Sequence, residues 1–121
     1  MRLNHAMIFV KDLPRMTAFY SGALKLPPIE ETRLHNWVEF DTGGARFSLH
    51  AIPSHIASGI EISSPPQPRE KNPIKLFFEV DDVATERKRL EAMGVVIIER
   101  PWGAIECVDP EGNLFEITAK R

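Results

Sequence analysis

The sequence predicts an α+β fold built from two tandem modules, each with the element order β-α-β-β-β. Two internal similarities carry this prediction. At an offset of seventy residues, the stretches 5–13 and 75–83 are both short strand-like runs that end in Val-x-Asp-(Leu/Val). At a slightly shorter offset, residues 40–49 and 108–117 both have the pattern strand, Asp-x-x-Gly turn, strand, which is typical of a β-hairpin.

A helix is expected after the first strand of each module. Asp12 and Asp82 stand at the N-cap position, where a carboxylate accepts hydrogen bonds from the free N–H groups of the first turn. Pro14 fits near the start of the first helix because its missing N–H costs little there. Apolar residues recur on one face of each helix, and Gly94 is the expected stop of the second.

The remaining strands are assigned less directly. The strands that enter the two hairpins are predicted at residues 37–40 and 105–108. A further strand in each module is expected near residues 31–35 and 95–99.

The chain is predicted to be one domain, residues 1–121, with module one at 1–52 and module two at 74–121. The connector 53–73 contains five prolines, which donate no backbone N–H and disfavour regular elements. A module of about fifty residues leaves an open sheet, so we expect the two modules to pack together and form a cupped mixed sheet.

Composition excludes several classes of protein. With 121 residues, 43% of them hydrophobic and 26% charged, the chain is neither disordered nor fibrous. A net charge of -2 offers no broad electrostatic footprint for nucleic acid or an anionic membrane. No apolar run approaches the roughly 18 residues of a membrane span. The start lacks a signal-peptide pattern, and a single cysteine, Cys107, suits a reducing compartment and a small core residue. We therefore expect a cytoplasmic protein.

Side chains alternate along a strand, so each strand has one face under a helix and one opposite face. The wholly apolar sets are expected under the helices. The opposite faces mix polar and apolar groups, as a ligand-binding surface does; they carry His5, Met7, Phe9, Ser48, His50, Lys75, Phe77, Glu79, Glu116 and Thr118. The repeat pairs His5 with Lys75 and Ser48 with Glu116. A pseudo-twofold relation between the modules would turn these four residues toward one cleft.

Three stretches resemble a known superfamily. The opening MRLNHAMIFVKDLPRMTAFYSGALKL resembles the start of glyoxalase I, and FFEVDDV and CVDPEGNLFEI resemble the second module of the vicinal oxygen chelate superfamily. That superfamily includes glyoxalase I, extradiol dioxygenases, fosfomycin-resistance enzymes, methylmalonyl-CoA epimerase and bleomycin-resistance proteins. The resemblance covers nearly the whole chain apart from the connector and is closest to glyoxalase I-like single-domain proteins. It implies the paired-module fold, but it does not select a reaction.

By this resemblance, the metal ligands of the superfamily correspond to His5, Ser48, Lys75 and Glu116. His5 and Glu116 suit Ni, Zn, Mn, Fe or Co. A protonated lysine has no lone pair and opposes a divalent cation, and serine is a weak ligand. Two interpretations therefore stand. Either His5, His50 and Glu116 hold a metal, or Lys75 is a permanent cation in the metal's place, paired with Glu116.

Two functions follow from these interpretations. If Lys75 takes the metal's place, the protein binds a small organic molecule in a cleft without needing a metal. If a metal is bound, the protein is a divalent-metal-dependent lyase, isomerase or dioxygenase. The metal then stabilises an enolate or similar anion while a carboxylate moves a proton. The catalytic candidates are Glu116 and Lys75, and the ligand-contact candidates are Met7, Phe9, Ser48, Phe77, Trp37 and Trp102.

A homodimer is also expected, because a duplicated open sheet has edges to cover. The predicted cleft lies either within one chain or across the dimer.

Overall fold

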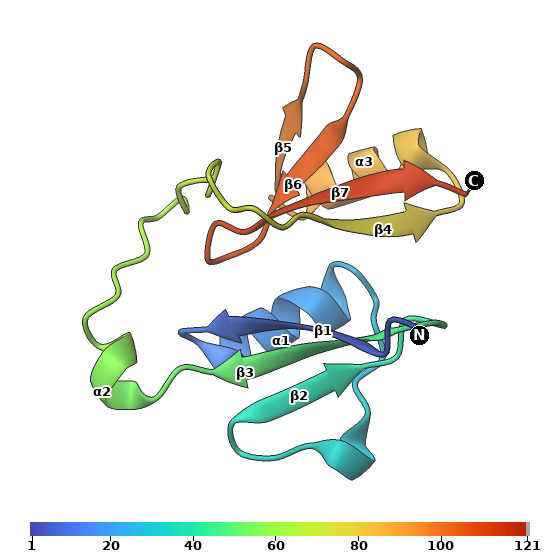
Figure 1. The fold of residues 1–121 in the computed structure, drawn as a ribbon. Helices are drawn as coiled ribbons and strands as arrows, with labels where there is room; N and C mark the ends of the chain where they lie inside the picture. Colours follow the sequence, from blue (N-terminus) through green and yellow to red (C-terminus); the bar gives the residue numbers. More distant parts are fainter. Residues whose placement is uncertain (121) are drawn as a thin grey trace. The chain divides into compact units, whose positions relative to one another are not determined.

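The computed structural model describes residues 1–120 and divides the chain into two units, Met1–Glu61 and Ile62–Arg121. We call them unit 1 and unit 2. Each unit has a mixed β-sheet with one α-helix packed against one of its faces (Figure 1). This confirms the α+β class and, in each unit, a parallel strand pair joined through a helix.

Unit 1 contains β1 (His5–Val10), α1 (Leu13–Gly22), β2 (Trp37–Phe40) and β3 (Arg46–Ala51). The strand order is β1-β3-β2, with β1 parallel to β3 and β2 antiparallel to it. Asp12 is the N-cap of α1, and its Oδ1 accepts a hydrogen bond from the Arg15 backbone N–H at 3.1 Å. The predicted cap and the predicted hairpin are both confirmed.

The prediction of a strand near residues 31–35 is wrong. A short 3-10 helix, η1 (Glu30–Thr32), lies there instead. Beside β2 the chain makes isolated bridges, such as the one between Pro28 and Phe40. Around Pro28 the chain does pair with β2, since Ile29 N–H donates to the Glu39 carbonyl (2.8 Å), but it then turns into η1 and leaves this edge.

Unit 2 contains β4 (Leu76–Val80), α3 (Val83–Ala92), β5 (Val96–Glu99), β6 (Ile105–Val108) and β7 (Leu114–Ala119). The strand order is β4-β7-β6-β5, with β4 parallel to β7. Asp82 caps α3 by accepting from the Thr85 N–H at 2.9 Å, and Gly94 follows the helix with a positive φ of 84°. The predicted strand near residues 95–99 is confirmed as β5.

The connector is more ordered than its prolines suggest. It contains the four-residue helix α2 (Ser54–Ala57), and residues 62–73 belong to unit 2. Arg69 donates from its backbone N–H to the Gly112 carbonyl (2.9 Å) and from Nε to the Glu111 carbonyl (3.0 Å). Gly112 has a φ of 87°, and a Cβ placed on it would lie 2.2 Å from the Gln67 carbonyl oxygen. The β6–β7 turn is therefore covered closely by the connector.

The helix-facing apolar side chains form the cores, as the alternation predicts. In unit 1, Tyr20 of α1 is buried with its ring 4.8 Å from that of Phe47. In unit 2, Leu90 and Phe115 are buried. Cys107 is also fully buried, and burial raises the pKa of its thiol to about 12, which supports its interpretation as a core residue. Among residues 1–120, no helix is long and apolar enough to cross a membrane.

Candidate functional site

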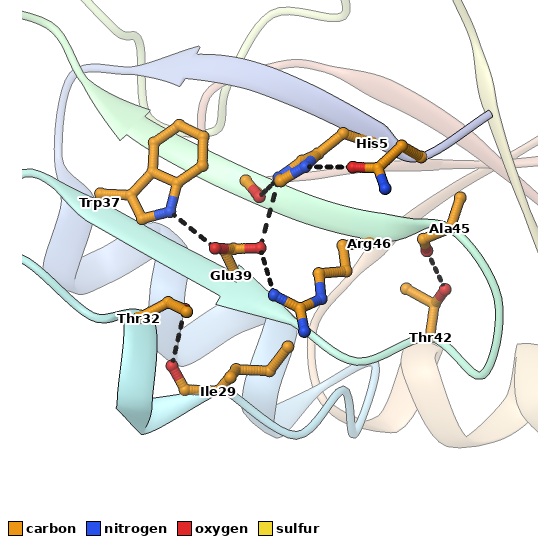
Figure 2. Close-up of polar contacts among 10 residues, drawn as sticks. His5, Ile29, Thr32, Trp37, Glu39, Thr42, Ala45 and Arg46 are labelled. Carbon is orange, nitrogen blue, oxygen red and sulfur yellow. Dashed lines mark hydrogen bonds and ion pairs between the residues drawn. The ribbon is translucent and has the colours of Figure 1, made fainter.

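The face of the unit 1 sheet opposite α1 carries a cluster of polar side chains. Figure 2 shows side chains from all three strands turned toward one carboxylate, that of Glu39. The strand register places Ser48 of β3 beside both Met7 of β1 and Glu39 of β2. We call the group the Glu39 cluster; its members are His5, Trp37, Glu39, Arg46 and Ser48.

Glu39 is a buried carboxylate with its charge compensated. Its Oε1 accepts from Trp37 Nε1 at 3.2 Å, and its Oε2 accepts from Arg46 Nη1 at 3.2 Å. Burial alone raises the pKa of the carboxyl, but the hydrogen bonds from Trp37 and Arg46 outweigh it, so the pKa lies below its ordinary value. Glu39 is therefore an anion at neutral pH, and Arg46 is its counterion.

His5 is held in place by this cluster. Its Nε2 is hydrogen-bonded to Ser48 Oγ at 2.5 Å and lies 3.4 Å from Glu39 Oε2. Its ring centroid lies 5.6 Å from that of Trp37. Ser48 is fully buried, so in unit 1 its hydroxyl serves to orient His5.

Unit 2 carries a corresponding group, which we call the Glu106 cluster; its members are Glu70, Lys75, Arg100 and Glu106. Glu106 is buried, and its Oε1 accepts a hydrogen bond from Lys75 Nζ. Its Oε2 accepts from Arg100 Nε at 3.0 Å and from Nη2 at 2.8 Å. Burial raises the pKa of Glu106, and the bonds from Arg100 and Lys75 more than offset that effect, so its pKa is lowered.

The predicted pairing of Lys75 with Glu116 is wrong, because Lys75 pairs with Glu106. Glu106 and Glu116 face each other in the β6–β7 register, so the lysine has two candidate anions nearby. The buried carboxylate needs a counterion more than the half-buried Glu116 does. Among residues 1–120, the side chain of Glu116 makes no hydrogen bond or ion pair.

Glu39 and Glu106 occupy equivalent positions, and sequence reasoning missed both. Glu39 faces Ser48, and Glu106 faces Glu116. Ser48 and Glu116 are the two residues that the repeat matches with each other. The turn of unit 2 is one residue longer, so an offset of 68 aligned Glu39 with Cys107 instead. Allowing one inserted residue in the second hairpin would have revealed the two carboxylates.

The predicted ligand-contact residues lie on the expected faces. Phe9 is 59% exposed and Phe77 53% exposed, and Met7 is also exposed. The His50 ring lies between those of Phe9 (5.5 Å) and Trp37 (5.7 Å). Phe77 faces Glu116 in the β4–β7 register. Each unit therefore presents exposed apolar surface beside its charged cluster.

Trp102 is the exception, since it lies in the turn between β5 and β6 rather than on a sheet face. It is 73% exposed, and the Arg100 guanidinium carbon lies 6.0 Å from the centroid of its ring. Residues 101–103 form this turn.

The donor sets inside each unit do not fit a divalent metal. The oxygens of Glu39 accept from Trp37 and Arg46, and those of Glu106 accept from two cations. A guanidinium or ammonium group at such short range repels a metal ion. In the part of the chain that the structure describes, no three His, Cys, Asp or Glu side chains gather as a metal site. His5 and His50 belong to unit 1 and Glu116 to unit 2, so a joint ligand set of these three stays a prediction.

Comparison with known proteins supplies the family. The model of the Glyoxalase/Bleomycin resistance protein/Dioxygenase superfamily matches residues 2–117. A protein of unknown function from Agrobacterium tumefaciens str. C58 is 27% identical, with a TM-score of 0.71 over 100% of this chain and 95% of that one. A glyoxalase/bleomycin resistance protein/dioxygenase family enzyme from Burkholderia phytofirmans PsJN is 25% identical, with a TM-score of 0.69 over 97% of each chain.

A lactoylglutathione lyase from Agrobacterium tumefaciens is 23% identical, with a TM-score of 0.66 over 94% of this chain and 90% of that one, and it supports the fold alone. No curated protein matches the sequence. The family match spans almost the entire chain, and the chain belongs to the glyoxalase/bleomycin resistance/dioxygenase superfamily.

Proposed function

We propose that this protein binds a small organic molecule through the sheet faces opposite α1 and α3, without requiring a divalent metal. One observation carries the proposal: on both faces, a half-exposed phenylalanine, Phe9 or Phe77, shares the sheet with a charged cluster whose members are already paired. Exposed aromatic rings supply binding area, and fixed polar groups orient a ligand.

The fixed cations support the metal-independent form of the proposal. Glu39 is compensated by Arg46, and Glu106 is compensated by Lys75 and Arg100. By the resemblance, Lys75 stands where metal-using members of this superfamily have a ligand, and its positive charge opposes a divalent cation there. The protein therefore supplies positive charge on these faces itself, and neither buried carboxylate needs a metal ion as its counterion.

Calorimetric titration with a neutral aromatic probe tests this function. Chelator-treated protein should bind 1-naphthol saturably, and added chelator should leave the affinity unchanged. Phe9→Ala and Phe77→Ala should each weaken binding by about two- to tenfold, the factor expected from one lost aromatic contact. Ile56→Ala is the matched control, because Ile56 is similarly exposed but lies in α2. An absence of binding, or an equal loss in the Ile56 variant, contradicts the proposal.

The alternative is a divalent-metal-dependent lyase, isomerase or dioxygenase. One observation favours it: Glu116 is a half-buried carboxylate with no hydrogen bond or ion pair among residues 1–120, so its oxygens are available as ligands. This alternative requires His5, His50 and Glu116 to meet. It predicts that chelation abolishes binding of the probe and that adding back Ni, Zn, Mn, Fe or Co restores it.

The predicted homodimer also belongs to this proposal. In the described sheets, β1 and β4 are edge strands, which present unpaired backbone groups. Pairing with a second copy would cover these edges. Sedimentation velocity should give twice the chain mass of 13.7 kDa, and a monomer at every concentration contradicts the prediction.

A further inference from the structure

A chain of ion pairs in unit 2 ends in a carboxylate that comes from the connector. Glu106 joins Lys75 to Arg100, and Arg100 in turn holds Glu70. We propose that Arg100, together with Trp102, is a recognition site for the carboxylate of a small planar organic acid, and that Glu70 occupies the site until the ligand displaces it. This inference rests on the proposed function and names the ligand's chemical class.

The charges around Glu106 do not balance without Glu70. Two cations, Lys75 and Arg100, share this single buried carboxylate. One positive charge in the group therefore remains to be compensated. Glu70 supplies that compensation, and both of its oxygens lie 2.8 Å from Arg100 Nη2. The place that Glu70 fills is thus already suited to a carboxylate.

Arg100 has one nitrogen that makes no hydrogen bond to residues 1–120. Its Nε and Nη2 donate to Glu106, and Nη2 also donates to Glu70. Among residues 1–120, the Arg100 Nη1 donates to no group. An arginine that presents two neighbouring nitrogens can bind a carboxylate with two parallel hydrogen bonds. A ligand carboxylate can use Nη1 and Nη2 together, whereas Glu70 uses Nη2 alone.

The two carboxylates that pair with Arg100, those of Glu106 and Glu70, differ in burial. Glu106 is buried, and removing it from its cations would leave uncompensated charge. The Glu70 side chain is 54% exposed, and an exposed ion pair contributes little to stability. An incoming carboxylate therefore competes with Glu70 and leaves the Glu106 pairs in place.

Trp102 supplies the surface for the rest of the ligand. The turn between β5 and β6 (Figure 1) is closed by two backbone bonds: Arg100 N–H donates to the Ala104 carbonyl (3.0 Å), and Gly103 N–H donates to the Arg100 carbonyl (2.9 Å). These bonds hold the exposed indole near the Arg100 guanidinium. A ring attached to the bound carboxylate can then pack against the indole, which selects planar acids over small inorganic anions.

The test is an NMR titration of ¹⁵N-labelled protein with benzoate and, separately, with the uncharged benzamide. The chain has two indole N–H signals, one from Trp37 in unit 1 and one from Trp102 in unit 2, assigned with Trp37→Phe and Trp102→Phe. Benzoate at millimolar concentrations should shift the Trp102 indole and the Arg100 Nε–H signals saturably. Benzamide should not shift them.

Variants sharpen the test without removing the counterion of Glu106. Glu70→Gln should tighten benzoate binding by about two- to fivefold, the factor that corresponds to one exposed ion pair. Arg100→Lys keeps the positive charge but loses the two-nitrogen fork, so it should weaken binding by at least that factor. Arg87→Gln is the control, because Arg87 also makes two exposed ion pairs in unit 2, with Glu91 and Glu99.

The benzoate experiment can fail independently of the proposed function, because that function is tested with 1-naphthol at Phe9 and Phe77. Equal shifts with benzoate and benzamide overturn carboxylate recognition. No shift of the Trp102 or Arg100 signals with benzoate overturns the location of the site. Unchanged or weaker benzoate binding in Glu70→Gln overturns the role of Glu70.

Discussion

The two units solve one electrostatic problem with different residues. Each places a buried glutamate on one face of its sheet, Glu39 on the edge strand β2 and Glu106 on the inner strand β6. Glu39 is paired with Arg46 and lies beside His5. Glu106 is paired with two cations, Lys75 and Arg100. The buried carboxylate therefore occupies equivalent positions in the two units, whereas its counterions are different residues.

The hairpin turns differ in a similar way. In unit 1, Asp41 Oδ1 accepts from the Gly43 N–H at 2.8 Å, and a Cβ added to Gly44 meets nothing within 4 Å. In unit 2, Asp109 Oδ1 accepts from two backbone N–H groups of the turn, both at 2.9 Å. That turn is also covered by the connector at Gly112. The same turn motif is an open loop in one unit and a packing site in the other.

The largest expected change in stability comes from a substitution that tests this difference between the turns. Gly112→Ala should lower the free energy of unfolding by about 2–5 kcal/mol, because it combines a positive φ with a backbone clash. Gly44→Ala, at the corresponding turn, should change it by less than about 0.5 kcal/mol. Urea unfolding followed by circular dichroism measures both. Similar losses in the two variants would mean that the connector does not pack on the unit 2 turn.

A smaller effect separates the two buried carboxylates. Glu106→Gln should cost about 2–3 kcal/mol, since two cations lose their charged acceptor, and Glu39→Gln about 1 kcal/mol, since its acceptor bonds include one neutral indole N–H. The same unfolding experiment compares them, with Glu61→Gln as a control outside both clusters. A larger loss in Glu39→Gln reverses the proposed order.

The smallest effect is a change in the pH dependence of stability. Both carboxyls have pKa values below their ordinary 4.5 in the folded chain, so the unfolded chain takes up protons first as the pH falls. Their contribution is therefore complete above about pH 5 and is lost as the pH falls through the lowered folded pKa values. Unfolding free energies measured between about pH 6 and pH 3 should fall for the parent and fall less steeply for Glu106→Gln. A parallel decline in the two proteins contradicts this assignment.

Local patterns predicted the frame of the molecule well. Asp12 and Asp82 cap their helices as expected, because a cap depends on residues within one turn. Strand alternation correctly separated the core faces from the polar faces. These features depend on short-range chemistry that any single sequence displays.

The candidate site was less predictable, because it depends on contacts between residues far apart in sequence. The partner of Lys75 is set by the burial of Glu106, which no local pattern reveals. The role of Arg100 depends on Glu70, thirty residues earlier. The strand near residues 31–35 is missing because the chain turns into η1 after pairing with β2 around Pro28.

We infer that cations of the protein stand in place of a bound metal on these faces. Equilibrium dialysis of chelator-treated protein against Ni, Zn, Mn, Fe or Co, followed by elemental analysis, tests this inference. We expect far less than one metal per chain and unchanged 1-naphthol affinity with each ion. One tightly held metal per chain, lost in both His5→Ala and Glu116→Gln, would contradict the inference and establish the metal-dependent alternative.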